Sequence, residues 1–168
     1  MPLLAKLAQR LDTVGARLVL LTKPSAMIQA LADSGVPFDL VPPFPSNRAA
    51  LEYLANNVSG LLISYADTVA EMPWIQTSFP SKLTEYAHLG LPCAVVAPED
   101  SAVGRWAVRH DFSGFFRPDQ LEAFAAWARD LRTEDGWQAR REIVRHFADD
   151  AFSPEKIQAA FAGSLLRQ

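Results

Sequence analysis

The chain has 168 residues, of which 49% are hydrophobic and 21% are charged, and its formal net charge is -3. Such a chain is long enough for one globular domain with its own core. The negative charge and the lack of a basic block in the sequence argue against non-specific binding to nucleic acid or to an anionic membrane. The single cysteine, Cys93, excludes an internal disulfide and a cysteine-based metal cluster, which suits a reducing compartment.

Short apolar runs alternate with amphipathic segments, a pattern typical of a parallel sheet with helices on both faces. The first segment, 3–11, places its leucines on one face and predicts a helix. The apolar runs that follow predict strands at 17–21, 38–41, 60–65, 93–97 and 114–117. The amphipathic segments between them predict helices at 24–33, 46–57, 80–89 and 102–110. We therefore expect an α/β fold with a Rossmann-like parallel sheet.

After Pro118 the pattern becomes helical, with predicted helices at 119–132, 135–147 and 154–166. We interpret 1–168 as a single domain, in which 1–117 alternates between helices and strands and 118–168 forms a C-terminal helical tail. The last helix carries an apolar stripe, which predicts self-association as a homo-oligomer where nothing else covers it. The stripe consists of Ile157, Ala160, Phe161 and Leu165.

No apolar run in the sequence approaches the roughly 18 to 20 residues that span a bilayer. The first residues lack the basic region, apolar core and small-residue cleavage site of a secretory leader. Together with the single cysteine, these features predict a cytoplasmic protein without a transmembrane segment. We also expect no metal or other cofactor, because the sequence holds neither an H-E-x-x-H motif nor a cysteine pair.

The most informative segment is 78–92, S-F-P-S-K-L-T-E-Y-A-H-L-G-L-P, which runs into an apolar strand. It predicts a helix that begins near Pro80 and stops at Gly90, a residue suited to a left-handed cap. The start of a helix presents unpaired amides and a partial positive charge, so it can hold a diphosphate without dedicated cations. Glu85 follows one turn later and can accept hydrogen bonds from a ribose diol. These features indicate a nucleotide diphosphate, and the alternative is an ordinary crossover helix with Lys82 and Glu85 as a surface pair.

The string T-S-F-P-S-K-L-T-E-Y at 77–86, followed by G-L-P at 90–92, resembles a known family. It is similar to the donor-binding core of the C-terminal domain of GT-B fold glycosyltransferases, in the large retaining group called family 4. The order of the predicted elements also resembles that domain over most of the chain. The resemblance implies one half of a GT-B fold that binds a nucleotide-diphosphate sugar, such as a UDP-sugar, as its substrate.

The resemblance also implies roles for individual residues. The backbone around Pro80, Ser81 and Lys82 would hold the diphosphate. Glu85 would hold the ribose hydroxyls, as the second acid of the family's E-x7-E pair. The first acid of that pair, which contacts the transferred sugar and bears on catalysis, falls on Thr77 here. A hydroxyl therefore replaces a carboxylate, and charge-assisted hydrogen bonding to the sugar is lost.

Three further residues are candidates for the same site. Asp67 and Glu71 lie in the predicted loop 66–79 and are candidate substitutes for the first acid. Arg105, near the start of the helix predicted at 102–110, can bring a cation toward a phosphate. Loop 66–79 leaves the carboxyl end of a strand, which is where open parallel sheets bind ligands.

The family's domain begins with a glycine-rich strand, followed by an arginine and a lysine that neutralise the leaving diphosphate. The present sequence begins at the helix that comes after them. We therefore expect the sheet either to be completed by another chain or to close the gap through new strand pairing. The acceptor-binding N-terminal domain also lies outside the sequence, so glycosyl transfer is expected to need that domain or a second chain.

Two other functions fit the same residues. One is a non-catalytic interaction or stabilising subunit derived from a glycosyltransferase, which Thr77 and the absent cationic strand favour. The other is a domain similar to nucleotide-sugar epimerases, which needs an acid/base pair at the sugar ring. The histidines are weak candidates for that pair, because each is expected at a surface or a helix end. They are His88, His110 and His146.

Overall fold

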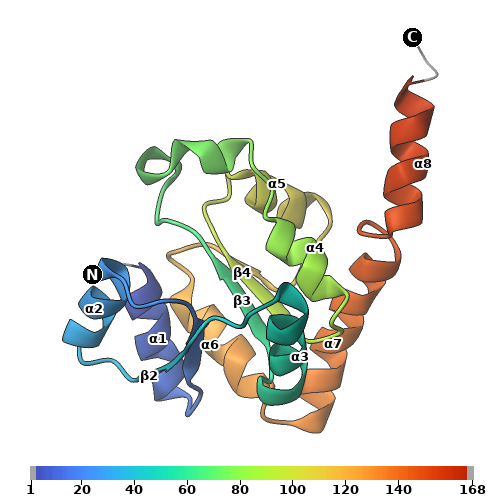
Figure 1. Cartoon of the computed structure of the whole chain (residues 1–168). Helices are drawn as coiled ribbons and strands as arrows, with labels where there is room; N and C mark the ends of the chain where they lie inside the picture. Colours follow the sequence, from blue (N-terminus) through green and yellow to red (C-terminus); the bar gives the residue numbers. More distant parts are fainter. Residues whose placement is uncertain (1–2, 166–168) are drawn as a thin grey trace.

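The structure, a computed structural model, describes residues 3–165, apart from the side chains of Ala160, Ser164 and Leu165. These residues form an α/β fold, as the alternating pattern predicts (Figure 1). The helices and strands are α1 (Leu3–Thr13), β1 (Leu18–Leu21), α2 (Ala26–Asp33), β2 (Phe38–Val41), α3 (Asn47–Asn57), β3 (Leu61–Ser64), α4 (Ser81–Ala87), β4 (Cys93–Val96), α5 (Ala102–Arg109), β5 (Phe115–Phe116), α6 (Leu121–Asp130), α7 (Glu134–Asp149) and α8 (Pro154–Leu165). Each predicted helix and strand is confirmed, with ends that differ by a few residues.

The strands form two separate parallel sheets instead of one. In the first sheet β1 pairs with β2, and in the second β4 lies between β3 and β5. Within residues 3–165, β1 has no hydrogen-bonded neighbour besides β2, and β3 has none besides β4. The expectation that new strand pairing closes the gap is therefore wrong. The single continuous sheet of a Rossmann-like domain is interrupted between β1 and β3.

The core lies on both faces of β4, whose four residues are all buried. Because successive side chains of a strand point to opposite faces, Cys93 and Val95 join one apolar cluster and Ala94 and Val96 join the other. The first cluster is formed with α3, α4, α5 and α7. The second is formed with α1, α2 and α6. Helices therefore cover both faces of this sheet, as the sequence predicts.

Local chemistry explains where several helices begin and end. The Ser46 hydroxyl accepts a hydrogen bond of 3.2 Å from the Ala49 amide and caps α3, which confirms the expected start. Ser25 caps α2 in the same way, so this helix begins at Ala26 and not at Pro24. Gly90 ends the segment after α4 with φ of 63°, the left-handed conformation expected for it.

The loop that precedes α4 is more ordered than its sequence suggests. It contains two short 3-10 turns, Val69–Glu71 and Pro73–Gln76. The Thr68 hydroxyl caps the first turn, and Ile75 in the second turn is completely buried. This burial anchors the loop on the core, so the chain enters α4 from a fixed position.

The last helix, α8, projects away from the rest of the molecule (Figure 1). Two members of the predicted apolar stripe, Ile157 and Phe161, are 51% and 65% exposed. The side chains of the other two members, Ala160 and Leu165, lie outside the described part of the chain. Self-association through this stripe stays a prediction. Over residues 3–165, none of the helices combines the length and the apolar character that crossing a membrane requires.

Candidate functional site

The start of α4 is open. Pro80, at the N-cap position, is buried and offers no side-chain cap, and the next two residues, Ser81 and Lys82, are exposed. The Leu83 amide donates to the Pro80 carbonyl oxygen, whereas no side chain caps the amides of Ser81 and Lys82, which leaves these two able to bind an anion. α4 has seven residues, and the partial positive charge at its N-terminus acts only within its first turn.

Glu85 lies on the next turn of α4 and is the residue of this segment with an unsatisfied oxygen. Its Oε2 is shielded from solvent and has no hydrogen-bond partner among the described residues. The nearest cation, Lys82 Nζ, lies 3.6 Å from that oxygen, which is beyond hydrogen-bond distance, and also lies over the Tyr86 ring. The surface pair that the sequence offers as an alternative therefore exists, but it leaves the carboxylate short of a donor.

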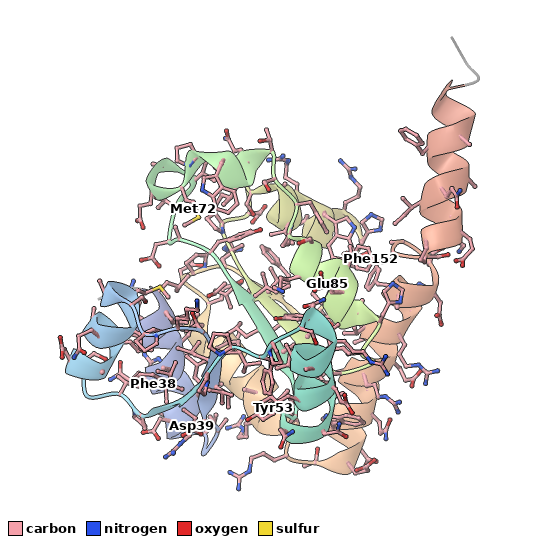
Figure 2. The ribbon with its side chains drawn as sticks, in the orientation of Figure 1. Phe38, Asp39, Tyr53, Met72, Glu85 and Phe152 are labelled. Atoms are coloured by element: carbon pink, nitrogen blue, oxygen red, sulfur yellow. The ribbon has the colours of Figure 1, made fainter. Side chains whose placement is uncertain are left out.

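Glu85 also lines a cavity of about 570 Å³ between α4 and α8. Figure 2 shows Glu85 on α4 with Phe152 close by, at the base of α8. Most of the lining surface is apolar, and the Glu85 carboxylate is the acidic group on it. The lining residues are Thr84, Glu85, His88, Phe152, Pro154, Ile157, Gln158 and Phe161. Ser81 and Lys82 are not among them, so the cavity begins one turn beyond the expected phosphate position.

The residues considered for sugar contact have other partners. The Thr77 hydroxyl, at the end of the second 3-10 turn, is 3.4 Å from the Trp74 carbonyl oxygen to which it donates. Asp67 forms an ion pair of 3.0 Å with Lys6 of α1. The Glu71 carboxylate is 3.5 Å from the Thr68 hydroxyl, a weak contact within the same turn. Each of these three side chains therefore already has a partner within the protein.

Arg105 ties two loops together. Its guanidinium donates a hydrogen bond of 2.7 Å to the Gln76 carbonyl oxygen and another to the Asp100 carbonyl oxygen. These bonds connect the start of α5 to the residue just before Thr77. Arg105 therefore holds the entrance to α4 in place, a role that sequence reasoning missed because the two carbonyls are distant in the chain.

The segment before α4 is also anchored by an aromatic cluster that the sequence did not reveal. Phe79 packs edge-on against Trp106, with 5.6 Å between ring centroids. Trp106 in turn stacks on Phe152 at 5.2 Å and contacts Phe147 at 5.1 Å. The phenylalanine of the F-P-S-K string is therefore a structural anchor that links the loop to α5 and to the end of α7.

All three histidines lie around this aromatic cluster. His88 Nε2 is 3.2 Å from the Phe152 carbonyl oxygen. His110 and His146 have ring contacts with Trp106 and Phe147, respectively. All three are exposed residues at or near the end of a helix, as expected, and the epimerase-like alternative stays a prediction.

Two further expectations concern reactive and metal-binding groups. Cys93 is fully buried in β4, and burial raises the pKa of its thiol to about 12, so it stays a protonated, apolar side chain. In the part of the chain that the structure describes, no group of histidine, cysteine and carboxylate side chains is arranged to hold a metal ion.

No protein-family model matches the chain, and no curated protein or solved structure matches it at a significant level. The likeness to glycosyltransferase donor domains therefore rests on the residues of 77–92 and on the order of the elements.

Proposed function

We propose that this chain is the donor-binding domain of a GT-B glycosyltransferase and binds a nucleotide-diphosphate sugar at the start of α4. The amides of Ser81 and Lys82 hold the diphosphate, and the Glu85 carboxylate accepts hydrogen bonds from the ribose hydroxyls. The observation that carries the proposal is the shielded Oε2 of Glu85, which has no donor among the described residues and lies one turn beyond an uncapped helix start. The Glu85 side chain as a whole is 37% exposed, so a turn of the carboxylate toward solvent brings this oxygen to a ribose diol, which supplies the donors that it lacks.

Binding is better supported than transfer. Thr77 supplies a hydroxyl where the family has a carboxylate, and Arg105 uses its guanidinium on two backbone carbonyls. Neither group is placed to neutralise a leaving diphosphate, and catalysis of glycosyl transfer is largely positioning and electrostatics. The domain therefore works with an acceptor-binding partner, either an N-terminal domain or a second chain.

The test is binding of UDP, GDP and ADP and of their hexose conjugates to the full chain, measured by thermal shift and by calorimetry. One base is expected to raise Tm selectively. Glu85→Gln removes the charge that strengthens the ribose hydrogen bonds and is expected to weaken binding by about 10- to 100-fold. Glu52→Gln, the same change at an exposed position of α3, is the matched control and should bind like the parent chain.

A second candidate is a non-catalytic interaction subunit that has kept the fold of a donor domain. The engaged side chains of Thr77 and Arg105 favour it, and so does the projecting α8 with Ile157 exposed. The two candidates give different results in the same experiment. The absence of any nucleotide-dependent shift in Tm would support the interaction subunit and overturn the donor site.

A further inference from the structure

A second cavity lies between the two sheets. It has a volume of about 600 Å³, and its walls include all four residues of β1 together with Leu61, Leu62 and Ser64 of β3. Helices close it on two sides. Leu54 and Tyr86 come from the cluster built on α3, α4, α5 and α7, whereas Phe124 and Trp127 come from the cluster built on α1, α2 and α6. The cavity thus spans both layers of the core at the place where the sheet is interrupted.

The backbone of both strands faces this cavity. In a parallel ladder, the N–H and C=O of one residue point to one neighbouring strand, and those of the next residue point to the opposite side. The Thr22 amide donates to the Val41 carbonyl, so Val19 and Leu21 direct their backbone groups away from β2. The Leu61 and Tyr65 amides donate to β4 or its flanking residue.

By the same alternation, Leu62 and Ser64 direct their backbone groups away from β4. Leu62 and Ser64, like Val19 and Leu21 of β1, line the cavity. Two rows of backbone donors and acceptors therefore border one space, whose walls are mostly apolar but also include Arg17, Asn57 and Arg132. Unpaired edges of this kind are templates for another strand. The side chains also differ from those of β4, since Leu20, Leu21 and Leu62 are half-buried whereas every residue of β4 is buried.

We propose that the cavity between β1 and β3 is a binding slot for an extended segment of a separate polypeptide chain, which joins the two sheets into one. The slot is bordered by the four residues of β1 and the four residues of β3. It can therefore pair with about four residues of an extended segment, a length of about 13 Å at about 3.3 Å per residue. Alternate side chains of the inserted strand enter the two core clusters, so the segment is apolar on both faces. This is strand addition at two edges at once.

A second copy of this chain fits the slot less well. The strands of the described residues are each paired within their own sheet, so donating one would break a ladder in the donor. A small apolar ligand would fill the volume but would leave the two rows of backbone groups unpaired, which costs free energy wherever water is excluded. The proposal does not depend on nucleotide binding at α4, and the two can fail separately.

The test uses the full chain and an end-blocked peptide, Lys-Val-Val-Ile-Val-Val-Lys, with a control peptide of the same sequence that is N-methylated at its three central residues. Amide hydrogen exchange is followed by NMR. The unmethylated peptide is expected to slow exchange at least tenfold at the four slot-facing amides. Ile63 and Val95, whose amides already face β4 and the Gly114 carbonyl oxygen within the central sheet, serve as internal references. The four slot-facing amides are those of Val19, Leu21, Leu62 and Ser64.

Each other outcome contradicts the proposal. No slowing shows that the slot does not bind a strand. Equal slowing by the methylated peptide shows an apolar cavity that binds without backbone pairing. Slow exchange at the four amides in the peptide-free protein, together with the mass of a dimer in light scattering, shows that a second copy fills the slot.

Proline variants provide an independent check. Val19→Pro and Leu62→Pro each remove one slot-facing N–H without removing a hydrogen bond of the existing ladders, and each is expected to weaken peptide binding about tenfold or more. Leu40→Pro is the matched control, because alternation turns its N–H to the outer edge of β2, and it should bind the peptide like the parent. Circular dichroism shows whether each variant folds. Where a variant does not fold, the comparison of the unmethylated and methylated peptides on the parent chain remains the test.

Discussion

The residues of the F-P-S-K-L-T-E-Y segment have two kinds of environment. Phe79, Pro80 and Leu83 are buried or packed on aromatic rings and hold the segment on the core. Ser81 and Lys82 are exposed at the open start of α4. The same string therefore contains both the residues that anchor the turn and the exposed residues that are candidates for ligand contact.

Cys93 gives a prediction at this scale. Burial raises the pKa of its thiol to about 12 from an ordinary 9.0. Below pH 9 the thiol is protonated in the folded and unfolded chains alike. Above pH 9 the unfolded chain ionises first, so the free energy of unfolding should fall by up to about 1.4 kcal/mol per pH unit until the folded pKa is reached.

The measurement is urea unfolding under reducing conditions at pH 8, 9 and 10. Cys93→Ala should show a shallower decrease over this range, since it has no thiol to ionise. The range stops at pH 10 because burial also raises the pKa of Tyr65 and Tyr86, which adds to the effect at higher pH. Equal slopes in the two proteins would contradict the assignment.

At the scale of elements, the start of α5 is a fully buried helix end. Ser101 is completely buried, its hydroxyl accepts a hydrogen bond of 3.0 Å from the Gly104 amide, and it donates one of 2.6 Å to the Pro98 carbonyl oxygen. A Cβ at position 104 would lie 2.3 Å from that same oxygen, so only glycine fits there. This turn positions Arg105 and, through it, the loop before α4.

Two serine caps in different environments allow a matched prediction. Ser101→Ala leaves the buried Gly104 amide without its partner, whereas the Pro98 carbonyl keeps the hydrogen bond of 3.1 Å from the amide of residue 101, so the free energy of unfolding should fall by about 2 to 3 kcal/mol. Ser46→Ala removes an exposed cap and should cost about 1 kcal/mol. Urea unfolding of both variants at pH 7 measures the difference. A cost at Ser101 no greater than that at Ser46 would show that burial adds nothing to this cap.

At the scale of the whole molecule, the two sheets have unequal support. The β1–β2 sheet has two strands, and much of β2 and α2 is exposed, whereas β4 is buried between two strands and two layers of helices. A two-stranded sheet is marginal without further packing. Because β1 also borders the slot, the β1–β2 sheet is packed against less of the protein than the sheet of β3, β4 and β5.

We therefore predict that the β1–β2 sheet opens before the rest of the protein unfolds. In native-state hydrogen exchange, the amide of Leu20 should exchange at least tenfold faster than that of Val95, which donates to the Gly114 carbonyl within the central sheet. Increasing urea at low concentration should leave this order unchanged. Identical protection at the two positions would mean that the sheets open together.

The sequence by itself determined the kind and order of the elements. Apolar runs such as 93–97 and serine caps such as Ser46 act over a few residues, so their physical effect is readable without the rest of the fold. The burial of Cys93 and the left-handed Gly90 follow from the same local logic. These features were predictable because neighbouring residues in the chain supply the interactions.

Only the tertiary structure decided how the sheets join and what surrounds Glu85. The gap between β1 and β3 depends on which strands find a partner, and strand pairing is a contact between residues far apart in the chain. The clamp formed by Arg105 and the cavity between α4 and α8 likewise depend on distant residues. Hydrophobic period and capping carry no information about such contacts, because many arrangements of the same elements bury the same apolar faces.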